Sequence, residues 1–296
     1  MEIKDLKGCG TALVTPFTLK GKLDENALKR LVSFQIEAGI DFLVPCGTTG
    51  ENPTLTSDEH QRIVELVVEN AGGKVPVIAG AGGYDTKSVI IMARKLSKLG
   101  ADAILSVTPY YNKPTQEGLY QHYRMIAESV DLPIILYNVP GRTSVNLLPE
   151  TVLRLSEIPS IIGIKEASGH IGQIGELAVK APSDFKIISG DDPNTLPMMA
   201  MGAVGVISVI SNQVPEAVIR LTHLCLGRKF REAMEIQRSL FDLMRYNFIE
   251  TNPVPVKTGL SMMGLIEETV RLPLVPMHPS NREKLYQCLK DLSLIQ

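Results

Sequence analysis

The sequence predicts an α/β fold, a (β/α)8 or TIM barrel followed by a C-terminal helical extension. Short apolar runs alternate with amphipathic helices eight times, and the connections between them are short. A chain of 296 residues is long for an ordinary domain but normal for an α/β barrel. A doubly wound open sheet is the runner-up, but the chain lacks the glycine-rich first turn typical of that fold. We therefore expect a barrel over residues 1–227, carrying the active site, and a helical extension over residues 228–296.

The expected strands are short runs rich in Ile, Val and Leu, the pattern of parallel strands that are buried on both faces. Their lengths and β-branched content favour buried strands over helices. They cover residues 11–17, 42–46, 76–80, 103–109, 133–138, 160–165, 185–190 and 204–210.

The expected helices follow the strands and carry start and stop signals. The first, residues 25–38, ends at Gly39, and the second begins with a capping box formed by Thr56 and Glu59. The later helices are expected over residues 86–99, 119–130, 149–158, 171–180 and 215–226, with a short segment at 195–201. The extension contributes helical segments at residues 229–246, 256–265 and 281–292.

Composition and charge exclude several classes of function. Lys and Arg number 30 against 32 Asp and Glu, without any basic block, so we expect neither nucleic acid nor an anionic membrane as a partner. No apolar run is long enough to span a bilayer, and the amino end lacks the apolar core of a signal peptide, so we expect a cytoplasmic protein. The four cysteines are scattered without metal-binding spacing, which indicates reduced thiols rather than disulfides or a zinc site.

The stretch 160–165 is an apolar strand that ends on a lysine, Lys165. Burial disfavours an ammonium group, and a neutral amine is what a carbonyl substrate needs to form a Schiff base. The alternative is a lysine whose head group reaches solvent or pairs with Glu166. Because the sites of α/β barrels lie at the carboxyl ends of the strands, we treat Lys165 as a candidate Schiff-base residue.

Further polar motifs follow the neighbouring strands, so the fold would bring them to the same end of the barrel. Residues 47–51 (Gly-Thr-Thr-Gly-Glu) form a tight turn whose amides and hydroxyls suit a carboxylate or phosphate. Tyr137 would end the strand beside Lys165, where a phenol could act as an acid–base group. Arg142 in the following loop can donate two hydrogen bonds to a carboxylate.

Two pairs of residues have competing interpretations. Tyr110 and Tyr111 follow the fourth strand, where paired tyrosines are more often packing residues, although a phenol at the mouth could relay a proton. Asp191 and Asp192 follow the seventh strand, but adjacent carboxylates point in different directions and no histidine joins them. We therefore expect no metal there, whereas the neighbouring Gly190 leaves room for a small substrate.

Together these motifs resemble the 4-hydroxy-tetrahydrodipicolinate synthase family, also called the dihydrodipicolinate synthase family. The similarity runs in order over essentially the whole chain, through residues 47–51, 110–111, 137–143, 163–167, 189–192, 252–257 and 272–274. It implies a Schiff-base condensation of pyruvate with L-aspartate 4-semialdehyde to 4-hydroxy-tetrahydrodipicolinate. This reaction is the first committed step of diaminopimelate and lysine biosynthesis, and it requires no metal or organic cofactor.

The resemblance also implies a role for each matched residue. In the family the matching lysine forms the Schiff base, and two tyrosines and a threonine form a proton relay. The implied catalytic residues are Lys165, Tyr137, Thr48 and Tyr111. The implied substrate-binding residues are Thr49 for the pyruvate carboxylate, Arg142 for the semialdehyde carboxylate, and Gly190 and Ile207 as pocket walls.

The resemblance implies partners and a regulatory site as well. In the family the tyrosine matching Tyr111 is supplied across a tight dimer interface, so we expect a homodimer or a dimer of dimers, that is, a homotetramer. The implied lysine-binding regulatory residues are Asn52, His60, Tyr84, Ser88 and Tyr110. Lysine-inhibited members typically carry His, Asn and Glu at the positions of Ser57, Tyr84 and Ser88, and losing a charge-assisted partner costs roughly 1.5–3 kcal/mol. We therefore expect weak or absent inhibition by lysine.

Three alternatives stay open at this point. A sister pyruvate-dependent aldolase, N-acetylneuraminate lyase or a 2-keto-3-deoxy-sugar-acid aldolase, would share the lysine, the tyrosine and the turn, although Arg142 and the Tyr110–Tyr111 pair favour the synthase. A catalytically silent paralogue that binds a keto acid is less favoured, because every matched position is intact. A phosphate-binding barrel isomerase lacks a clear phosphate loop after the seventh and eighth strands.

Overall fold

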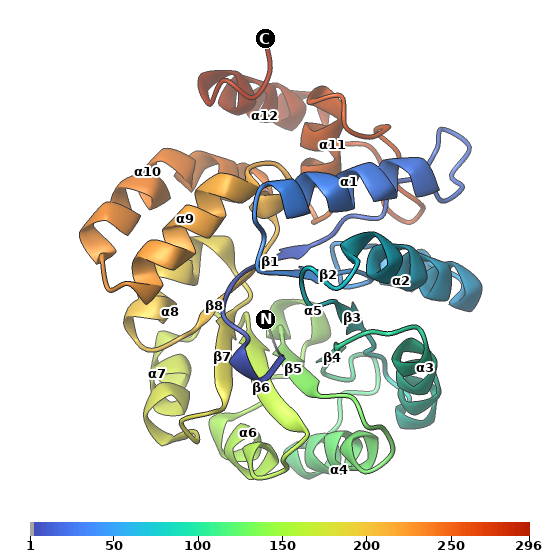
Figure 1. The fold of residues 1–296 in the computed structure, drawn as a ribbon, viewed down its shortest axis with the longest axis vertical. Coiled ribbons are helices and arrows are strands. Elements are labelled where there is room, and N and C mark those ends of the chain that lie inside the picture. Colours follow the sequence, from blue (N-terminus) through green and yellow to red (C-terminus); the bar gives the residue numbers. More distant parts are fainter. Residues whose placement is uncertain (1–2) are drawn as a thin grey trace.

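The computed structural model describes residues 3–296, and its centre is a barrel of eight parallel strands (Figure 1). The strands are β1 (Gly8–Ala12), β2 (Phe42–Val44), β3 (Ile78–Gly80), β4 (Ala103–Val107), β5 (Ile134–Asn138), β6 (Ile161–Glu166), β7 (Lys186–Ser189) and β8 (Gly205–Ser208). They are hydrogen-bonded in the order β2-β1-β8-β7-β6-β5-β4-β3. This arrangement confirms the predicted (β/α)8 barrel.

The barrel closes between β2 and β3 through a short parallel bridge between Leu43 and Val77. The Leu43 amide donates to the Pro76 carbonyl at 2.9 Å, and the Gly80 amide donates to the Pro45 carbonyl at 2.9 Å. Because the two prolines have no amide hydrogen, each can accept a ladder hydrogen bond but cannot donate one. The hydrogen-bonded ladder between β2 and β3 is therefore short.

Helices follow the strands and form an outer ring (Figure 1). The ring helices are α1 (Glu25–Glu37), α2 (Ser57–Ala71), α3 (Thr86–Lys98), α4 (Gln116–Ala127), α6 (Pro149–Ser156), α7 (Ile171–Lys180), α8 (Thr195–Ala200) and α9 (Pro215–Leu226). A short helix, α5 (Pro140–Thr143), follows β5 directly. The 3-10 turns are η1 (Ile3–Asp5), η2 (Asn52–Thr54), η3 (Asp192–Asn194) and η4 (Ile210–Asn212). The predicted capping box of the second helix is present, with reciprocal hydrogen bonds between Thr56 and Glu59.

Side chains alternate across each strand, so the barrel has an inner and an outer apolar layer. The inner layer fills the barrel and includes Phe42, Val44, Ile78, Leu105, Ile135, Tyr137, Ile188 and Ile207. The outer layer packs the strands against the helices and includes Leu43, Ile104, Leu136, Ile164 and Val206. A residue that acts on a substrate at the open end of the barrel must belong to the inner face.

The first strand lies earlier than predicted. The apolar pattern indicated residues 11–17, whereas β1 spans Gly8–Ala12. Gly10 lies against the ring of Phe42, and a Cβ added to Gly10 would stand 2.0 Å from Phe42 Cε2. Because β1 contains glycines, one of which lies against Phe42, it has no continuous run of apolar side chains. The apolar run in the sequence begins only near the end of the strand, so the predicted strand was placed too late.

Two helices near the site also differ from the expectation. Helix α4 begins at Gln116 rather than residue 119, because the Thr115 hydroxyl caps it by accepting from the Gly118 amide at 3.2 Å. Helix α5 was not expected, since four residues are too few to show a helical period.

The C-terminal extension consists of α10 (Phe230–Tyr246), α11 (Val254–Met262) and α12 (Pro279–Asp291). Figure 1 shows α10 beside α9, and α11 and α12 grouped beyond α1. Val256 and Leu260 of α11 share a buried apolar cluster with Val14, Ala27 and Leu31 from the barrel. The extension is confirmed as helical, whereas a domain boundary at residues 227 and 228 stays a prediction. None of the helices in the described residues combines the length and the hydropathy needed to cross a bilayer.

Candidate active site

Lys165 lies on the inner face of the barrel near the carboxyl end of β6, and only 5% of its surface is exposed. In the strand register it stands between Tyr137 of β5 and Ile188 of β7. Its Nζ lies 4.5 Å from the centroid of the Tyr137 ring. The fold therefore brings together the lysine and the tyrosine that the sequence analysis placed on neighbouring strands.

Glu166 does not pair with Lys165, because successive residues of a strand point to opposite faces. Its buried carboxylate accepts hydrogen bonds from Asn138 Nδ2 at 3.1 Å, the Ser168 amide at 2.6 Å and Gln173 Nε2 at 3.3 Å. Both carboxylate oxygens are occupied on the outer side of the strand. The sequence alternative of a Lys165–Glu166 pair is therefore wrong, and the amine faces the barrel interior.

A glycine keeps the space beside Lys165 free. A Cβ added to Gly190 would stand 3.0 Å from both Cε and Cγ of Lys165, and 2.8 Å from the Cβ of Ala167. A larger residue would push the lysine side chain out of its place. Ile207 on β8 is buried in the same inner layer as Tyr137. The two predicted pocket walls thus border the barrel interior, and their contact with a substrate stays a prediction.

The turn after β2, residues 47–51, is tightly folded. The Gly50 amide donates to the Gly47 carbonyl at 3.1 Å, and the Glu51 amide donates to the Thr48 carbonyl at 3.1 Å. Across the described part of the chain, the amides of Thr48 and Thr49 find no backbone acceptor. The Gly47 amide likewise donates to no backbone carbonyl among the described residues, so the turn uses two of its own amides and leaves three that could bind an anion.

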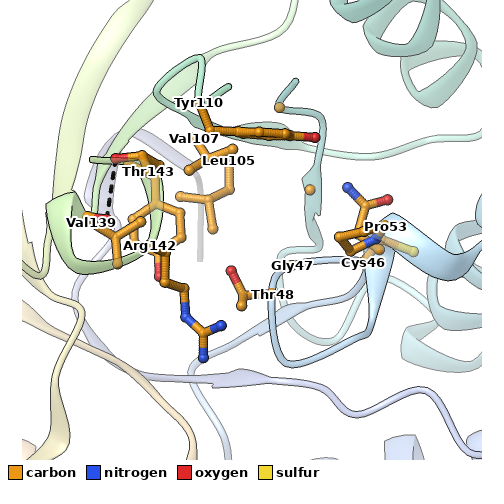
Figure 2. Close-up of a pocket in the computed structure, with 14 residues that line it drawn as sticks. Cys46, Gly47, Thr48, Pro53, Leu105, Val107, Tyr110, Val139, Arg142 and Thr143 are labelled. Carbon is orange, nitrogen blue, oxygen red and sulfur yellow. Dashed lines mark hydrogen bonds between the residues drawn. The ribbon is translucent and has the colours of Figure 1, made fainter. Parts of the chain in front are cut away.

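Thr48, Tyr110, Tyr137 and Arg142 border one cavity of about 220 Å³, which is built from the segments that follow β2 to β5. Figure 2 shows Arg142 and Thr48 extending toward the same open space from α5 and from the turn after β2. The other lining residues are Cys46, Gly47, Asn52, Pro53, Gly80, Gly82, Leu105, Val107, Val139 and Thr143. The cavity suits a substrate of only a few carbon atoms.

Arg142 is held at this cavity by its own short helix and by the extension. The Thr143 hydroxyl has the Val139 carbonyl at 3.2 Å and the Val145 carbonyl at 2.9 Å as acceptors for its one hydrogen, which ties α5 to the end of β5 (Figure 2). Arg142 Nη2 donates to the backbone carbonyl of Asn252 at 3.0 Å. A guanidinium has five donor hydrogens, so this contact leaves others for a substrate carboxylate.

The two tyrosines after β4 have different environments. Tyr110 borders the cavity and packs edge-on against Tyr84, with ring centroids 5.3 Å apart. Burial is the main cause that raises the pKa of the Tyr110 phenol. Tyr111, in contrast, is 90% exposed and does not border the cavity. A single chain thus leaves Tyr111 outside this cavity.

The candidate regulatory residues gather around a second cavity of about 210 Å³. Asn52, His60, Tyr84 and Ser88 border it, and Asn52 borders the first cavity as well. His60 is buried, and its Nε2 has no hydrogen-bond partner within residues 3–296. Burial lowers the pKa of His60 to about 4, so the imidazole facing this cavity is neutral near pH 7. Tyr110 does not border the second cavity but packs on Tyr84 at its edge.

Asp191 and Asp192 have separate structural partners. Asp192 accepts hydrogen bonds from the amides of Val209 at 2.9 Å and Ile210 at 3.2 Å, and so fixes the backbone after β8. Asp191 accepts from Asn194 Nδ2 at 2.5 Å. Burial raises the pKa of both carboxyls. Over the ranges that the structure describes, no group of three or more His, Cys, Asp or Glu side chains is arranged to hold a metal ion.

The sequence analysis missed the residues of the extension that hold the turn after β2. Asn252 Nδ2 donates to Thr49 Oγ1 at 3.0 Å, and Lys257 Nζ donates to a Glu51 carboxylate oxygen at 2.5 Å. Residues 252–257 matched the family's pattern, but the neighbouring sequence does not indicate that Lys257 pairs with Glu51, which lies 206 positions earlier. The one available signal was a lysine in an otherwise apolar segment.

Comparisons with known proteins agree over the full length. The model of the dihydrodipicolinate synthetase family matches residues 5–292. A 4-hydroxy-tetrahydrodipicolinate synthase from Pelobacter propionicus is 52% identical over 289 residues, covering 98% of this chain and 99% of the relative. The corresponding enzyme from Koribacter versatilis is 49% identical over 292 residues, covering 98% of this chain and 97% of the relative. A chloride-inhibited dihydrodipicolinate synthase from Acinetobacter baumannii, solved in complex with pyruvate, is 43% identical, with a TM-score of 0.96 and coverage of 98% and 99%.

Proposed function

The chain belongs to the dihydrodipicolinate synthetase family, and we propose that its site carries out the 4-hydroxy-tetrahydrodipicolinate synthase reaction. In this reaction pyruvate condenses with L-aspartate 4-semialdehyde. The observation that carries the proposal is the place of Lys165. It is a buried lysine on the inner face of the barrel, with Tyr137 and Gly190 beside it and the Glu166 carboxylate turned away.

The amine of Lys165 attacks the keto carbon of pyruvate, and water leaves as the imine forms. The imine nitrogen accepts electron density, so a methyl proton can leave and an enamine results. The enamine carbon attacks the aldehyde of the second substrate. The amino group of that substrate then displaces Lys165 and closes the ring, which frees the lysine for another turnover.

We propose Tyr137 as the acid–base group at the imine, because its ring stands beside the lysine in the register of β5 and β6. Thr48 borders the same cavity and would pass the proton onward to a second phenol. The resemblance assigns that second phenol to Tyr111. Its 90% exposure supports a role in the site of a partner copy rather than in its own site. We therefore propose a homo-oligomer, a homodimer or a dimer of dimers, with Tyr111 shared across the tight interface.

The two substrate carboxylates are assigned to different groups. The free amides of Thr48 and Thr49, together with the Thr49 hydroxyl, would bind the carboxylate of pyruvate. The guanidinium of Arg142 would bind the carboxylate of the semialdehyde, since it extends into the same cavity. Gly190 and Ile207 would line the pyruvate pocket.

We propose that lysine inhibits the enzyme weakly or not at all. The second cavity offers Ser88 and Tyr84 where lysine-inhibited members present a glutamate and an asparagine. A neutral hydroxyl cannot replace the carboxylate that would pair with an ammonium group. All four cysteines are free and buried, which fits a reducing compartment, and we accordingly propose a cytoplasmic location.

The test of the proposed function is pyruvate consumption by the purified protein with a panel of aldehydes. The panel is aspartate semialdehyde, N-acetylmannosamine and glyceraldehyde, with Lys165→Ala as the control. We expect consumption with aspartate semialdehyde alone, and none in the control. Consumption with a sugar aldehyde instead would move the substrate to a sister aldolase. No consumption with any aldehyde would favour a catalytically silent keto-acid-binding protein.

A further inference from the structure

Asn252 makes two contacts that join the turn after β2 to the short helix α5. Its Nδ2 donates to Thr49 Oγ1 at 3.0 Å, and its backbone carbonyl accepts from Arg142 Nη2 at 3.0 Å. Thr49 belongs to the turn after β2, and Arg142 belongs to α5 after β5. Asn252 itself comes from the C-terminal extension and is 5% exposed. One residue far along the chain thus touches both of the groups proposed to hold substrate carboxylates.

The direction of the Asn252–Thr49 hydrogen bond decides what the threonine hydroxyl can do. A hydroxyl has one donor hydrogen and two acceptor lone pairs. Because the amide of Asn252 supplies the hydrogen in this contact, the hydrogen of Thr49 stays free for another acceptor. A carboxylate is a strong acceptor and gives the stronger, charge-assisted kind of hydrogen bond. The asparagine therefore prepares Thr49 to donate to an anionic substrate.

The surroundings of Asn252 favour this role over packing alone. Its Oδ1 has no hydrogen-bond partner among the described residues, but the same is true of the buried Asn247. What sets Asn252 apart is its Nδ2 contact with Thr49, since Asn247 Nδ2 binds Gln213 instead. Five positions on, Lys257 binds Glu51 at the other end of the same turn. The segment is therefore fixed to the turn at two points.

We propose that Asn252 is a positioning residue for both substrate carboxylates. Its side chain keeps the Thr49 hydroxyl directed toward pyruvate as a donor, and its carbonyl holds Arg142 at the mouth. This inference rests on the proposed function, and it gives the C-terminal extension a part in substrate binding.

The experiment compares Asn252→Ala and Asn252→Asp with wild type in steady-state kinetics, varying pyruvate and the semialdehyde separately. The matched controls are Asn247→Ala and Asn247→Asp. Asn247 is also buried in the extension and also carries an unpartnered Oδ1 within the described chain. Its Nδ2 donates to Gln213 Oε1 at 2.8 Å rather than to a residue of the turn after β2.

We expect Asn252→Ala to raise the KM for pyruvate about 10- to 100-fold, the worth of one hydrogen bond to a charged group, with kcat close to wild type. The KM for the semialdehyde should change less, because the backbone carbonyl that holds Arg142 survives the substitution. Asn252→Asp should raise the KM for pyruvate further, since its carboxylate would take the Thr49 hydrogen and repel the substrate. The Asn247 variants should keep both KM values.

An unchanged KM for pyruvate in Asn252→Ala would overturn the proposal, and so would equal losses in the Asn252 and Asn247 variants. Thr49→Val keeps the test decisive if Asn252→Ala does not fold. It removes the hydroxyl with little change of shape, and a wild-type KM for pyruvate in this variant would also overturn the proposal. A failure of the proposed function can be told apart from a failure of this inference. In the first case wild-type protein would consume no pyruvate with aspartate semialdehyde, whereas in the second case only the variants would behave differently from the expectation.

Discussion

Lys257 and Glu51 form an ion pair that is closed to solvent, with 2.5 Å between Nζ and Oε1 and side-chain exposures of 1% and 0%. The second oxygen of Glu51 accepts from the Arg271 amide at 3.0 Å. The ring of Phe17 lies beneath both cations, 4.3 Å from Lys257 Nζ and 4.1 Å from Arg271 Cζ. This relationship ties the turn after β2 to α11. The substrate end of the barrel is therefore held by the extension as well as by the strands.

Lys257→Met should destabilise the protein strongly. Removing one partner of a buried ion pair leaves the other charge buried alone, which costs about 3–5 kcal/mol. The double variant Lys257→Met with Glu51→Gln should recover part of that loss, because no unpaired charge remains. Urea denaturation at fixed protein concentration measures both. Lys180→Met is the control, since its pair with Glu176 at 2.7 Å is exposed and such pairs contribute about 0–1 kcal/mol. Equal losses for the two lysines would contradict this account.

Tyr111→Phe should lower kcat strongly while pyruvate binding survives, because the phenol would serve proton transfer rather than substrate binding. Tyr120→Phe is a suitable control, as the Tyr120 ring packs under Arg154 on the outer surface. Mixing the inactive Tyr111→Phe and Lys165→Ala variants gives a sharper result. Hybrid dimers would contain one complete site, so random mixing should restore about a quarter of wild-type activity. No recovery in demonstrated hybrids would contradict the shared site, and wild-type turnover of Tyr111→Phe would remove its role in the relay.

Lysine should inhibit weakly, because Asp85, whose carboxylate borders the second cavity, already accepts from the Ser88 amide and hydroxyl, and Ser88 itself stands where lysine-inhibited members carry a glutamate. Introducing that group, with Ser57→His and Tyr84→Asn alongside Ser88→Glu, should increase lysine affinity by about one to two decades. Initial rates at a series of lysine concentrations measure the effect. A triple variant no more sensitive than wild type would show that these side chains are not the cause, and half-inhibition of wild type at micromolar lysine would refute the prediction itself.

Acid should destabilise the fold through two buried histidines. Burial lowers the pKa of His60 and of His122 from 6.5 to about 4, so each stays neutral in the folded chain while it gains a proton in the unfolded chain. The unfolded state then binds more protons between these values. The contribution of each histidine to the free energy of unfolding should be complete above pH 6.5. It should decrease as the pH drops to about 4, by at most about 3 kcal/mol for each histidine. When the free energy of unfolding is measured by urea denaturation at several pH values across this range, it should fall less steeply with decreasing pH in His122→Asn than in wild type. An identical slope would show that His122 does not contribute.

Contacts that follow from the order of the strands could be predicted from the sequence. Contacts between side chains far apart in the sequence could not. Lys165 and Tyr137 could be placed together because they end neighbouring parallel strands, and side-chain alternation put both on the inner face. The first strand was displaced because Gly10 has no side chain to carry a pattern. Glu51 and Lys257 could not be paired, because only the folded chain brings the extension to the turn. Tyr111 is exposed in the single chain and does not border the first cavity, so its role in the site of a partner copy stays a prediction.

The most direct test of the central claim is reduction with borohydride in the presence of pyruvate, followed by peptide mapping by mass spectrometry. The account predicts a single adduct on Lys165, heavier by the mass of pyruvic acid less one oxygen atom, and no adduct in Lys165→Ala. Lys257, the other buried lysine of the site region, should stay unmodified because Glu51 holds its ammonium. An adduct on another lysine, or none on Lys165 while pyruvate is consumed, would contradict the Schiff-base mechanism.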